Sequence, residues 1–266
     1  MVSNEALESW SVMAACPPVH ISRPAGRNFS RNFMGSLTEA DGPHGFGARL
    51  KAHWVFKTVA MTFFTLAFFC GYFLLLKFPV FPVTVMPLTA LDRWIGFQPT
   101  ALALYISLWF YVPLAPGLIA DKRELVTYYW AMLGLAMVGL AVFFFWPTSI
   151  PPQQIDWADH PAFGELKAVD SSGNACPSLH VAFAIFSAIW LDRLLRRMGR
   201  HAGLRVLSWC WCAGILYSTL ATKQHVAIDV VAGAAFGTIA AIIHGHRVRS
   251  RSLVDVVGRA KSLRTA

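Results

Sequence analysis

The sequence predicts an all-α integral membrane protein, built as a bundle of six transmembrane helices, and three observations support this. Hydrophobic residues make up 56% of the 266 residues and charged residues only 14%, well below the roughly one quarter typical of soluble domains. Six segments approach the ~20 apolar residues that a helix needs to cross a bilayer. Lysine and arginine are concentrated in alternate connections between these segments, which is typical of a chain that crosses a membrane repeatedly.

The six predicted spans are separated by polar or proline-rich connections. The first span, over 54–76, ends at the proline-rich stretch KFPVFPVTVMP. The stretch PLTALDRWIGFQP then predicts a short helix at the membrane interface, before the second span over 99–119. The third span, over 125–146, ends at WPTSIPP, because successive prolines cannot continue a helix. The remaining spans are predicted at 178–195, 204–222 and 225–244.

The distribution of basic residues predicts the orientation, because lysine and arginine favour the cytoplasmic loops. We expect both termini in the cytoplasm, with the protein in an inner or plasma membrane. The loop over 147–177 and the turn between the last two spans then lie on the outer face. The predicted cytoplasmic side carries Arg49, Lys51, Lys57, Lys122, Arg123, Arg193, Arg196, Arg197, Arg200, Arg205, Arg247, Arg249 and Arg251, and the outer side carries Lys77, Arg93, Lys167 and Lys223.

Three regions follow from this topology: a flexible basic cytoplasmic tail over 1–50, a six-helix membrane catalytic domain over 51–246, and a basic cytoplasmic tail over 247–266. The first region lacks the early apolar core of a signal peptide. The net charge of +9 indicates contact with anionic membrane lipids rather than with nucleic acid, since basic and aromatic residues are not interleaved. The five cysteines fit no metal or disulfide pattern, and Cys176 is expected on an exposed loop.

Two polar clusters stand at predicted outer ends of spans. His180 lies in NACPSLHVAFAIF and His225 in YSTLATKQHVAIDVVAG, so the topology brings both histidines to one membrane depth. In a helix, His225 and Asp229 would share a face, and the carboxylate would fix the histidine tautomer, leaving the other ring nitrogen as a nucleophile. His180 would then act as the general acid, while Ser178, Ser218 and a cation would hold a tetrahedral anion. Ser178 is also a good candidate for a helix N-cap.

These clusters resemble the paired motifs of the type 2 phosphatidic acid phosphatase superfamily. That family has Pro-Ser-Gly-His followed later by Ser-Arg-x5-His-x3-Asp, and this chain has Cys-Pro-Ser-Leu-His and Ser-Thr-x5-His-x3-Asp. Leu179 and Thr219, together with LDRWIGFQP and FFFWPTSIPP, are similar to the inositolphosphorylceramide synthase (aureobasidin-resistance) branch. The resemblance covers residues 85 to 240.

The resemblance implies a membrane lipid-phosphate phosphatase or phosphotransferase that works through a phosphohistidine and needs no metal or other cofactor. His225 matches the nucleophile, Asp229 its orienting acid and His180 the general acid. Ser178 and Ser218 match the phosphate-binding hydroxyls. The implied substrate is a lipid phosphate or an isoprenyl (di)phosphate at the outer membrane–water interface. Water or another alcohol, such as inositol or a sugar, would accept the phosphoryl group.

The chain departs from the family at its cations. The Lys-x6-Arg-Pro block is not recognisable, SIPPQQ has no arginine, and Thr219 replaces the arginine of the last block. The candidate replacements are Lys223, then Arg93 and Lys167. Lys223 could instead be an interfacial anchor, and Arg93 could pair with Asp92.

One other kind of protein remains as an alternative, a non-catalytic lipid-phosphate carrier or scaffold that retains the pocket. His160 lies near Asp156 and Asp159 in the outer loop, but the spacing is poor for a metal site, and the loop is expected to form part of a lid or substrate rim. The small residues of DVVAGAAFGTIAA predict close helix packing.

Overall fold

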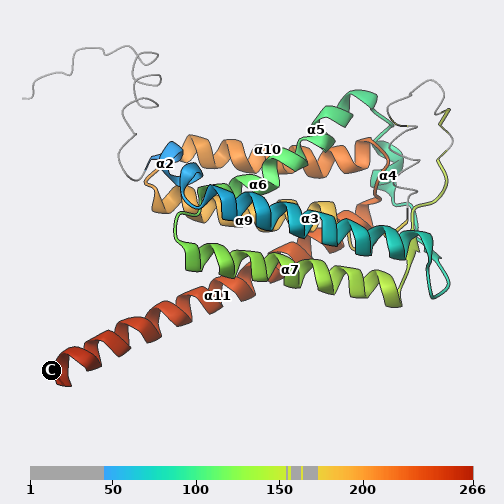
Figure 1. Ribbon diagram of the computed structural model, residues 1–266. Coiled ribbons are helices and arrows are strands. Elements are labelled where there is room, and N and C mark those ends of the chain that lie inside the picture. Colours follow the sequence, from blue (N-terminus) through green and yellow to red (C-terminus); the bar gives the residue numbers. More distant parts are fainter. Residues whose placement is uncertain (1–44, 154, 157–162, 164–172, 266) are drawn as a thin grey trace, which may run out of the picture. The chain divides into compact units, whose positions relative to one another are not determined.

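Long helices dominate the structure because the apolar spans satisfy their backbone hydrogen bonds internally, which the interior of a membrane demands. The computed structural model describes residues 45–153, 155, 156, 163 and 173–265, with side chains up to residue 246 (Figure 1). These residues belong to one unit of the chain, residues 41–266. The predicted tail over 1–50 falls almost entirely outside the described residues. In the described part, the long helices are α3 (Trp54–Lys77), α6 (Leu108–Leu118), α7 (Lys122–Phe145), α9 (Leu179–Arg197), α10 (Ala202–Ala221) and α11 (Ala227–Thr265).

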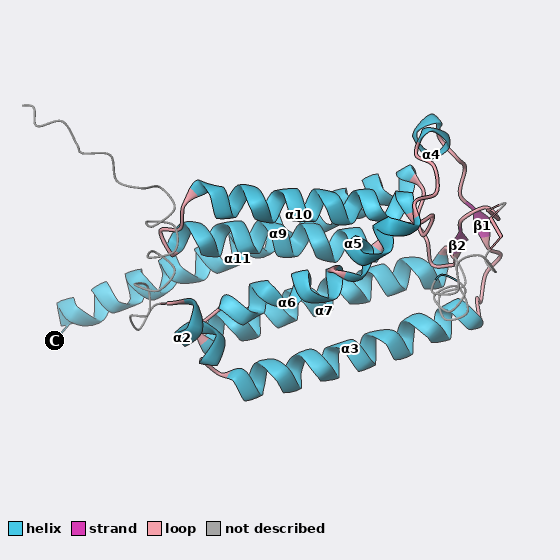
Figure 2. Cartoon of the chain, turned by 90° about the horizontal axis from the view of Figure 1, so that it is seen from above, coloured by secondary structure: helices cyan, strands magenta, loops and turns pink. Residues whose placement is uncertain are grey.

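The predicted all-α membrane bundle is confirmed, and within the described residues five helical segments are long and apolar enough to cross a membrane. They are α3, the segment Pro99–Leu118, α7, α10 and the first half of α11. The predicted fourth span, α9, does not meet this criterion because its last turns carry Asp192, Arg193, Arg196 and Arg197. Most of its other residues are buried against α6, α10 and α11, so α9 forms the centre of the bundle (Figure 2).

The predicted second span is divided into three helical pieces. These are η2 (Pro99–Ala101), α5 (Leu102–Ile106) and α6. Ser107 stands between α5 and α6, where its hydroxyl donates to the Leu104 carbonyl at 2.6 Å and accepts from the Trp211 indole at 2.8 Å. The polar side chain at this break is therefore hydrogen-bonded to α10.

Short elements fix the connections at the two ends of the bundle. The predicted interfacial helix is α4 (Ala90–Trp94), and α2 (Phe46–Lys51) precedes α3. Two strands that the sequence did not reveal, β1 (Thr84–Val85) and β2 (Thr148–Ser149), pair in parallel and join the proline-rich loops after α3 and α7. They are too short to show the alternating pattern by which strands are recognised.

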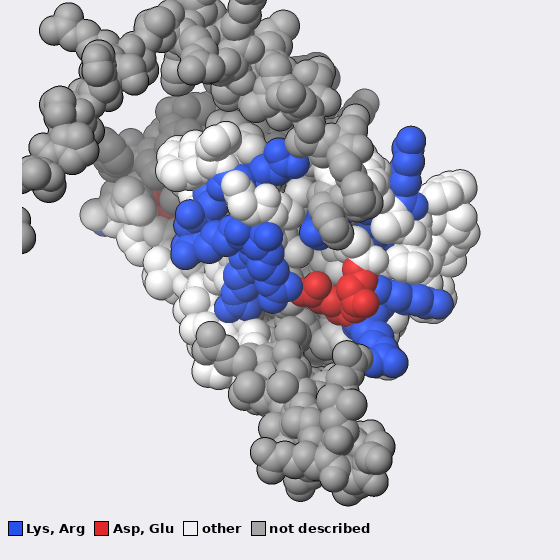
Figure 3. All heavy atoms as spheres, turned by 90° about the vertical axis from the view of Figure 1, so that its left-hand side faces the viewer, with Lys and Arg blue, Asp and Glu red and all other residues white. Residues whose placement is uncertain are grey.

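Basic residues gather at the end of the bundle where α7 begins and α9 finishes, around a smaller acidic patch (Figure 3). Asp192 pairs with both Arg196 and Arg205, and Glu124 pairs with Arg197. The residues predicted to face the cytoplasm thus share one end of the bundle. The first turn of α9, which carries His180, is at the other end.

The predicted close packing of small residues is present between α9 and α11. A Cβ atom on Gly233 would overlap the backbone carbonyl of Ser178, and one on Gly237 would overlap that of Ala182. Only glycine permits this approach of two backbones. The crossing lies one turn below Asp229, so it sets the distance between the two histidine clusters.

Candidate active site

Ser178 begins α9 and fixes the position of His180. Its side-chain oxygen accepts a hydrogen bond from the Val181 amide at 3.3 Å, so the expected N-cap is present. Its own amide donates to the backbone carbonyl of Asp229 at 3.1 Å. Ser178 is fully buried, and its hydrogen bond from Val181 uses the hydroxyl oxygen as acceptor and leaves the hydroxyl proton unused in that bond.

His225 is held in the turn between α10 and α11. The turn closes when the amides of Gln224 and His225 both donate to the carbonyl of Thr219, at 3.0 and 3.1 Å. Lys223 adopts a left-handed conformation there, with φ of 54°, which is uncommon outside glycine and concentrated at functional sites. The sequence predicted that His225 lies at the start of the last helix. In the structure it precedes α11, which begins at Ala227, by two residues.

Asp229 still reaches His225 from the first turn of α11. Its Oδ2 lies 3.6 Å from Nδ1 of His225 and accepts from the Val226 amide at 3.1 Å. The first distance is longer than a hydrogen bond, and catalytic contacts are often longer in an unliganded site than in the complex. Asp229 is fully buried and His225 is 8% exposed, so the carboxylate and the ring share a low-dielectric environment.

The two histidines meet at one end of the bundle. Their ring centroids lie 5.7 Å apart, although the residues are 45 positions apart in the sequence. His180 comes from the first turn of α9, whose positive dipole end favours an anion. At the start of α11, by contrast, two carboxylates already occupy backbone amides, since Asp229 binds Val226 and Asp92 binds Ala227.

Ser218 is buried on α10 near the end of that helix. Its hydroxyl donates to the carbonyl of Ile215 at 2.6 Å, and its carbonyl accepts from the Thr222 hydroxyl at 2.7 Å. The hydroxyl proton is thus already used within the helix. In this state, Ser218 can offer a bound phosphate only an acceptor, whereas Ser178 can offer a donor.

The candidate cations lie in different places. Nζ of Lys223 donates to the carbonyls of Asp92 and Ile95, at 2.8 and 2.5 Å, which ties the turn to α4. Burial lowers the pKa of Lys223, and the Asp92 carboxylate partly opposes this. Arg93 is exposed and donates to the Leu88 carbonyl at 3.4 Å. Lys167 lies outside the described residues.

Asp92 links α4 to the start of α11, a structural role that the sequence did not show. One carboxylate oxygen accepts from the amide and hydroxyl of Thr89, each at 2.7 Å, and the other accepts from the Ala227 amide at 2.7 Å. Asp92 thus caps both α4 and α11, and it does not serve as the partner proposed for Arg93. The sequence Thr-Ala-Leu-Asp does signal the capping box on α4. The contact with Ala227, 135 positions away, has no local signal.

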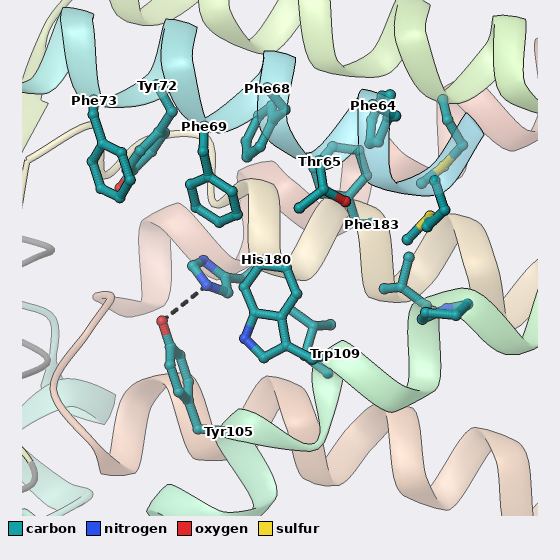
Figure 4. Close-up of a pocket in the computed structure, with 15 residues that line it drawn as sticks. Phe64, Thr65, Phe68, Phe69, Tyr72, Phe73, Tyr105, Trp109, His180 and Phe183 are labelled. Carbon is teal, nitrogen blue, oxygen red and sulfur yellow. Dashed lines mark hydrogen bonds between the residues drawn. The ribbon is translucent and has the colours of Figure 1, made fainter. Parts of the chain in front are cut away.

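Tyr105 is the second residue that sequence reasoning missed. Its hydroxyl lies 2.9 Å from Nε2 of His180, and the two rings are 5.1 Å apart (Figure 4). The side chain is 3% exposed. It comes from α5, so the break at Ser107 helps to direct this tyrosine toward α9.

Cys176 lies beside Asp229 and is buried, contrary to the exposed position expected from the sequence. Burial, followed by the nearby Asp229 carboxylate, raises the pKa of Cys176 to about 11. The thiol therefore stays protonated at neutral pH and is a poor nucleophile. His160 and Asp159, the other group considered for metal binding, lie outside the described residues.

One comparison with known proteins identifies a family. A family model described as PAP2 superfamily matches residues 88–243, a range that contains both histidine clusters and α4. No curated protein and no solved structure gives a significant match. Because the matched range is more than half of the chain, the chain belongs to the PAP2 superfamily, the type 2 phosphatidic acid phosphatases.

Proposed function

We propose that this protein is a membrane lipid-phosphate phosphatase that forms a phosphohistidine on His225. Membership of the PAP2 superfamily supports a lipid phosphatase or phosphotransferase activity. The observation that carries the finer proposal is the 5.7 Å separation of the His180 and His225 rings, with Asp229 behind His225. A nucleophile, its orienting acid and a second proton-transfer group are the parts that this chemistry needs.

In the proposed reaction, Nδ1 of His225 is held by Asp229, and Nε2 attacks the phosphorus atom. An N–P bond forms as the P–O bond to the lipid breaks, and His180 gives a proton to the departing oxygen. Water then attacks phosphorus, His180 takes back a proton, and the N–P bond breaks to release inorganic phosphate. Ser178 and the amino terminus of α9 stabilise the charge on the phosphoryl oxygens.

We place this site on the outer face of the membrane and the basic end of the bundle in the cytoplasm. The basis is the positive-inside rule, applied to the arginines around Asp192 and Glu124. Residues 1–50 and 247–266 are then cytoplasmic tails flanking a catalytic domain over 51–246. The second tail begins as a continuation of α11, which reaches Thr265.

Hydrolysis is the simpler outcome because it requires no second binding site. Transfer to an alcohol, as in the inositolphosphorylceramide synthase branch, requires the acceptor to reach the phosphohistidine before water does. Adding inositol or a sugar to the assay separates the two outcomes. A transferase forms a new phosphodiester or phosphomonoester, whereas a phosphatase releases only inorganic phosphate.

Purified full-length protein in detergent is expected to release phosphate from phosphatidic acid or an isoprenyl diphosphate in the presence of EDTA. The proposed steps use only protein groups, so a chelator should leave the rate unchanged. Release should be followed as free phosphate against a protein-free control. If phosphate is not released while labelled lipid moves between liposome leaflets, the protein is a carrier and the phosphatase proposal is wrong.

Replacing Tyr105 by phenylalanine is expected to lower kcat about fivefold and to leave KM nearly unchanged. The hydroxyl holds His180 at Nε2, and one such hydrogen bond contributes about 1 kcal/mol. Tyr129→Phe is a matched control, because it removes a hydroxyl hydrogen bond to Lys57 at the opposite end. Equal kcat values for the two variants would show that Tyr105 does not position His180.

A further inference from the structure

An apolar groove runs down the bundle from the histidine site. Its volume is about 380 Å³, within the range of small-molecule sites. One wall is a row of aromatic side chains on α3, from Phe64 to Phe73, and the facing walls come from α5, α6, α7 and α9 (Figure 4). His180 and Tyr105 lie in the groove wall, so the cavity reaches the proposed catalytic group directly.

The dimensions of the groove match a hydrocarbon chain. Its lining on α3 extends from Met61 to Phe73, which is about 18 Å at 1.5 Å per residue. Half the hydrocarbon core of a bilayer is about 15 Å thick. The lining is therefore about as long as one leaflet is thick, and it crosses the middle of α3, with His180 in its wall.

The groove is accessible from the lipid side. Phe64, Thr65, Phe68 and Phe69 are only half-buried, and Trp109 on the opposite wall is 45% exposed. Phe69 and Trp109 approach each other across the groove, with ring centroids 5.5 Å apart. A hydrocarbon chain that enters between α3 and α6 from the lipid side would have to part these two rings.

We propose that this groove binds one hydrocarbon chain of the lipid phosphate whose phosphoryl group reaches His225. This proposal rests on the proposed function and adds the part of the substrate that the site recognises. The donor lipid is the favoured occupant because the groove wall includes His180, the group that protonates the departing oxygen. Binding of the chain in the groove would hold the phosphate at the two histidines.

Thr65→Trp is designed to fill the groove, and Leu66→Trp is its matched control. Thr65 faces the groove, whereas Leu66, the next residue on α3, is 67% exposed on another face. We expect Thr65→Trp to lower kcat/KM for palmitoyl phosphatidic acid about tenfold or more, since it displaces several buried methylene groups. Turnover of the butanoyl analogue should not change, and Leu66→Trp should affect neither substrate.

A second readout does not require turnover. A palmitoyl phosphonate with a photoreactive group in the middle of its chain should label α3 or α6 in full-length protein, and Thr65→Trp should abolish the label. Labelling elsewhere, or equal effects of Thr65→Trp on both substrates, would overturn the groove proposal while the phosphatase stands. Correct labelling by a protein that turns over neither substrate would contradict the proposed function alone. Thermal unfolding of both variants checks that the fold is retained.

Discussion

His225→Ala is expected to reduce phosphate release from a lipid phosphate by a factor on the order of 10³ or more. The substitution removes the atom that bonds to phosphorus, and loss of a covalent nucleophile has effects of this size or larger. Asp229 and His180 would remain in place but would have no intermediate to act on. The measurement is kcat with phosphatidic acid, at equal amounts of folded protein.

His246→Ala is the matched control, because this histidine is exposed on α11 toward the basic end of the bundle. It should retain the full rate. A second readout is the enzyme quenched in alkali after brief exposure to substrate labelled in its phosphate. A label that is stable to base and lost in acid should remain on the wild type and on His246→Ala only. Undiminished release by His225→Ala would rule out the phosphohistidine mechanism.

The sequence predicted the meeting of the two histidines because the prediction needed only topology. Spans of fixed length alternate direction, so His180 and His225 had to reach the same end of the bundle. His225 and Asp229 lie close together even though His225 precedes the helix, but Nδ1 and Oδ2 are 3.6 Å apart, which is longer than the predicted hydrogen bond.

The partners of these residues could not be predicted because they come from distant segments. Lys223 was the leading candidate for a phosphate-binding cation, yet its ammonium group binds carbonyls of α4, more than 120 positions away. Tyr105 reaches His180 from α5, 75 positions earlier in the chain. Hydropathy predicts that a segment crosses a membrane and carries no information on such contacts.

Hydropathy did not predict that α9 lies in the centre of the bundle; its buried residues and its contacts with α6, α10 and α11 show this. A helix enclosed by other helices need not face lipid, so it can carry Asp192 and three arginines near one end. Its polar residues lie at the two ends of the bundle. Ser178 and His180 are at one end, and the ion pairs of Asp192 are at the other. This division explains why α9, which carries His180, is largely buried yet is not among the five described helical segments apolar enough to cross a membrane.

Gly233→Ala is expected to destabilise the protein by about 1–3 kcal/mol and to lower activity by more than the unfolded fraction explains. The added Cβ would overlap the carbonyl of Ser178 and would lie 3.1 Å from Cβ of Val181, so α9 and α11 must separate. Separation would weaken the bond from the Ser178 amide to the Asp229 carbonyl and move His180 away from His225. Thermal unfolding in detergent and kcat measured well below the midpoint check both effects.

Gly134→Ala on α7 provides the control, since a Cβ there meets nothing within 4 Å. Alanine is favoured over glycine inside a helix by up to about 1 kcal/mol, so this variant should be as stable as the wild type or more stable. If Gly233→Ala behaved like Gly134→Ala in both measurements, the backbone contact at Ser178 would not determine the geometry of the site. Loss of activity at temperatures where Gly233→Ala is still folded would show instead that the separation of α9 and α11 sets the distance between the two histidines.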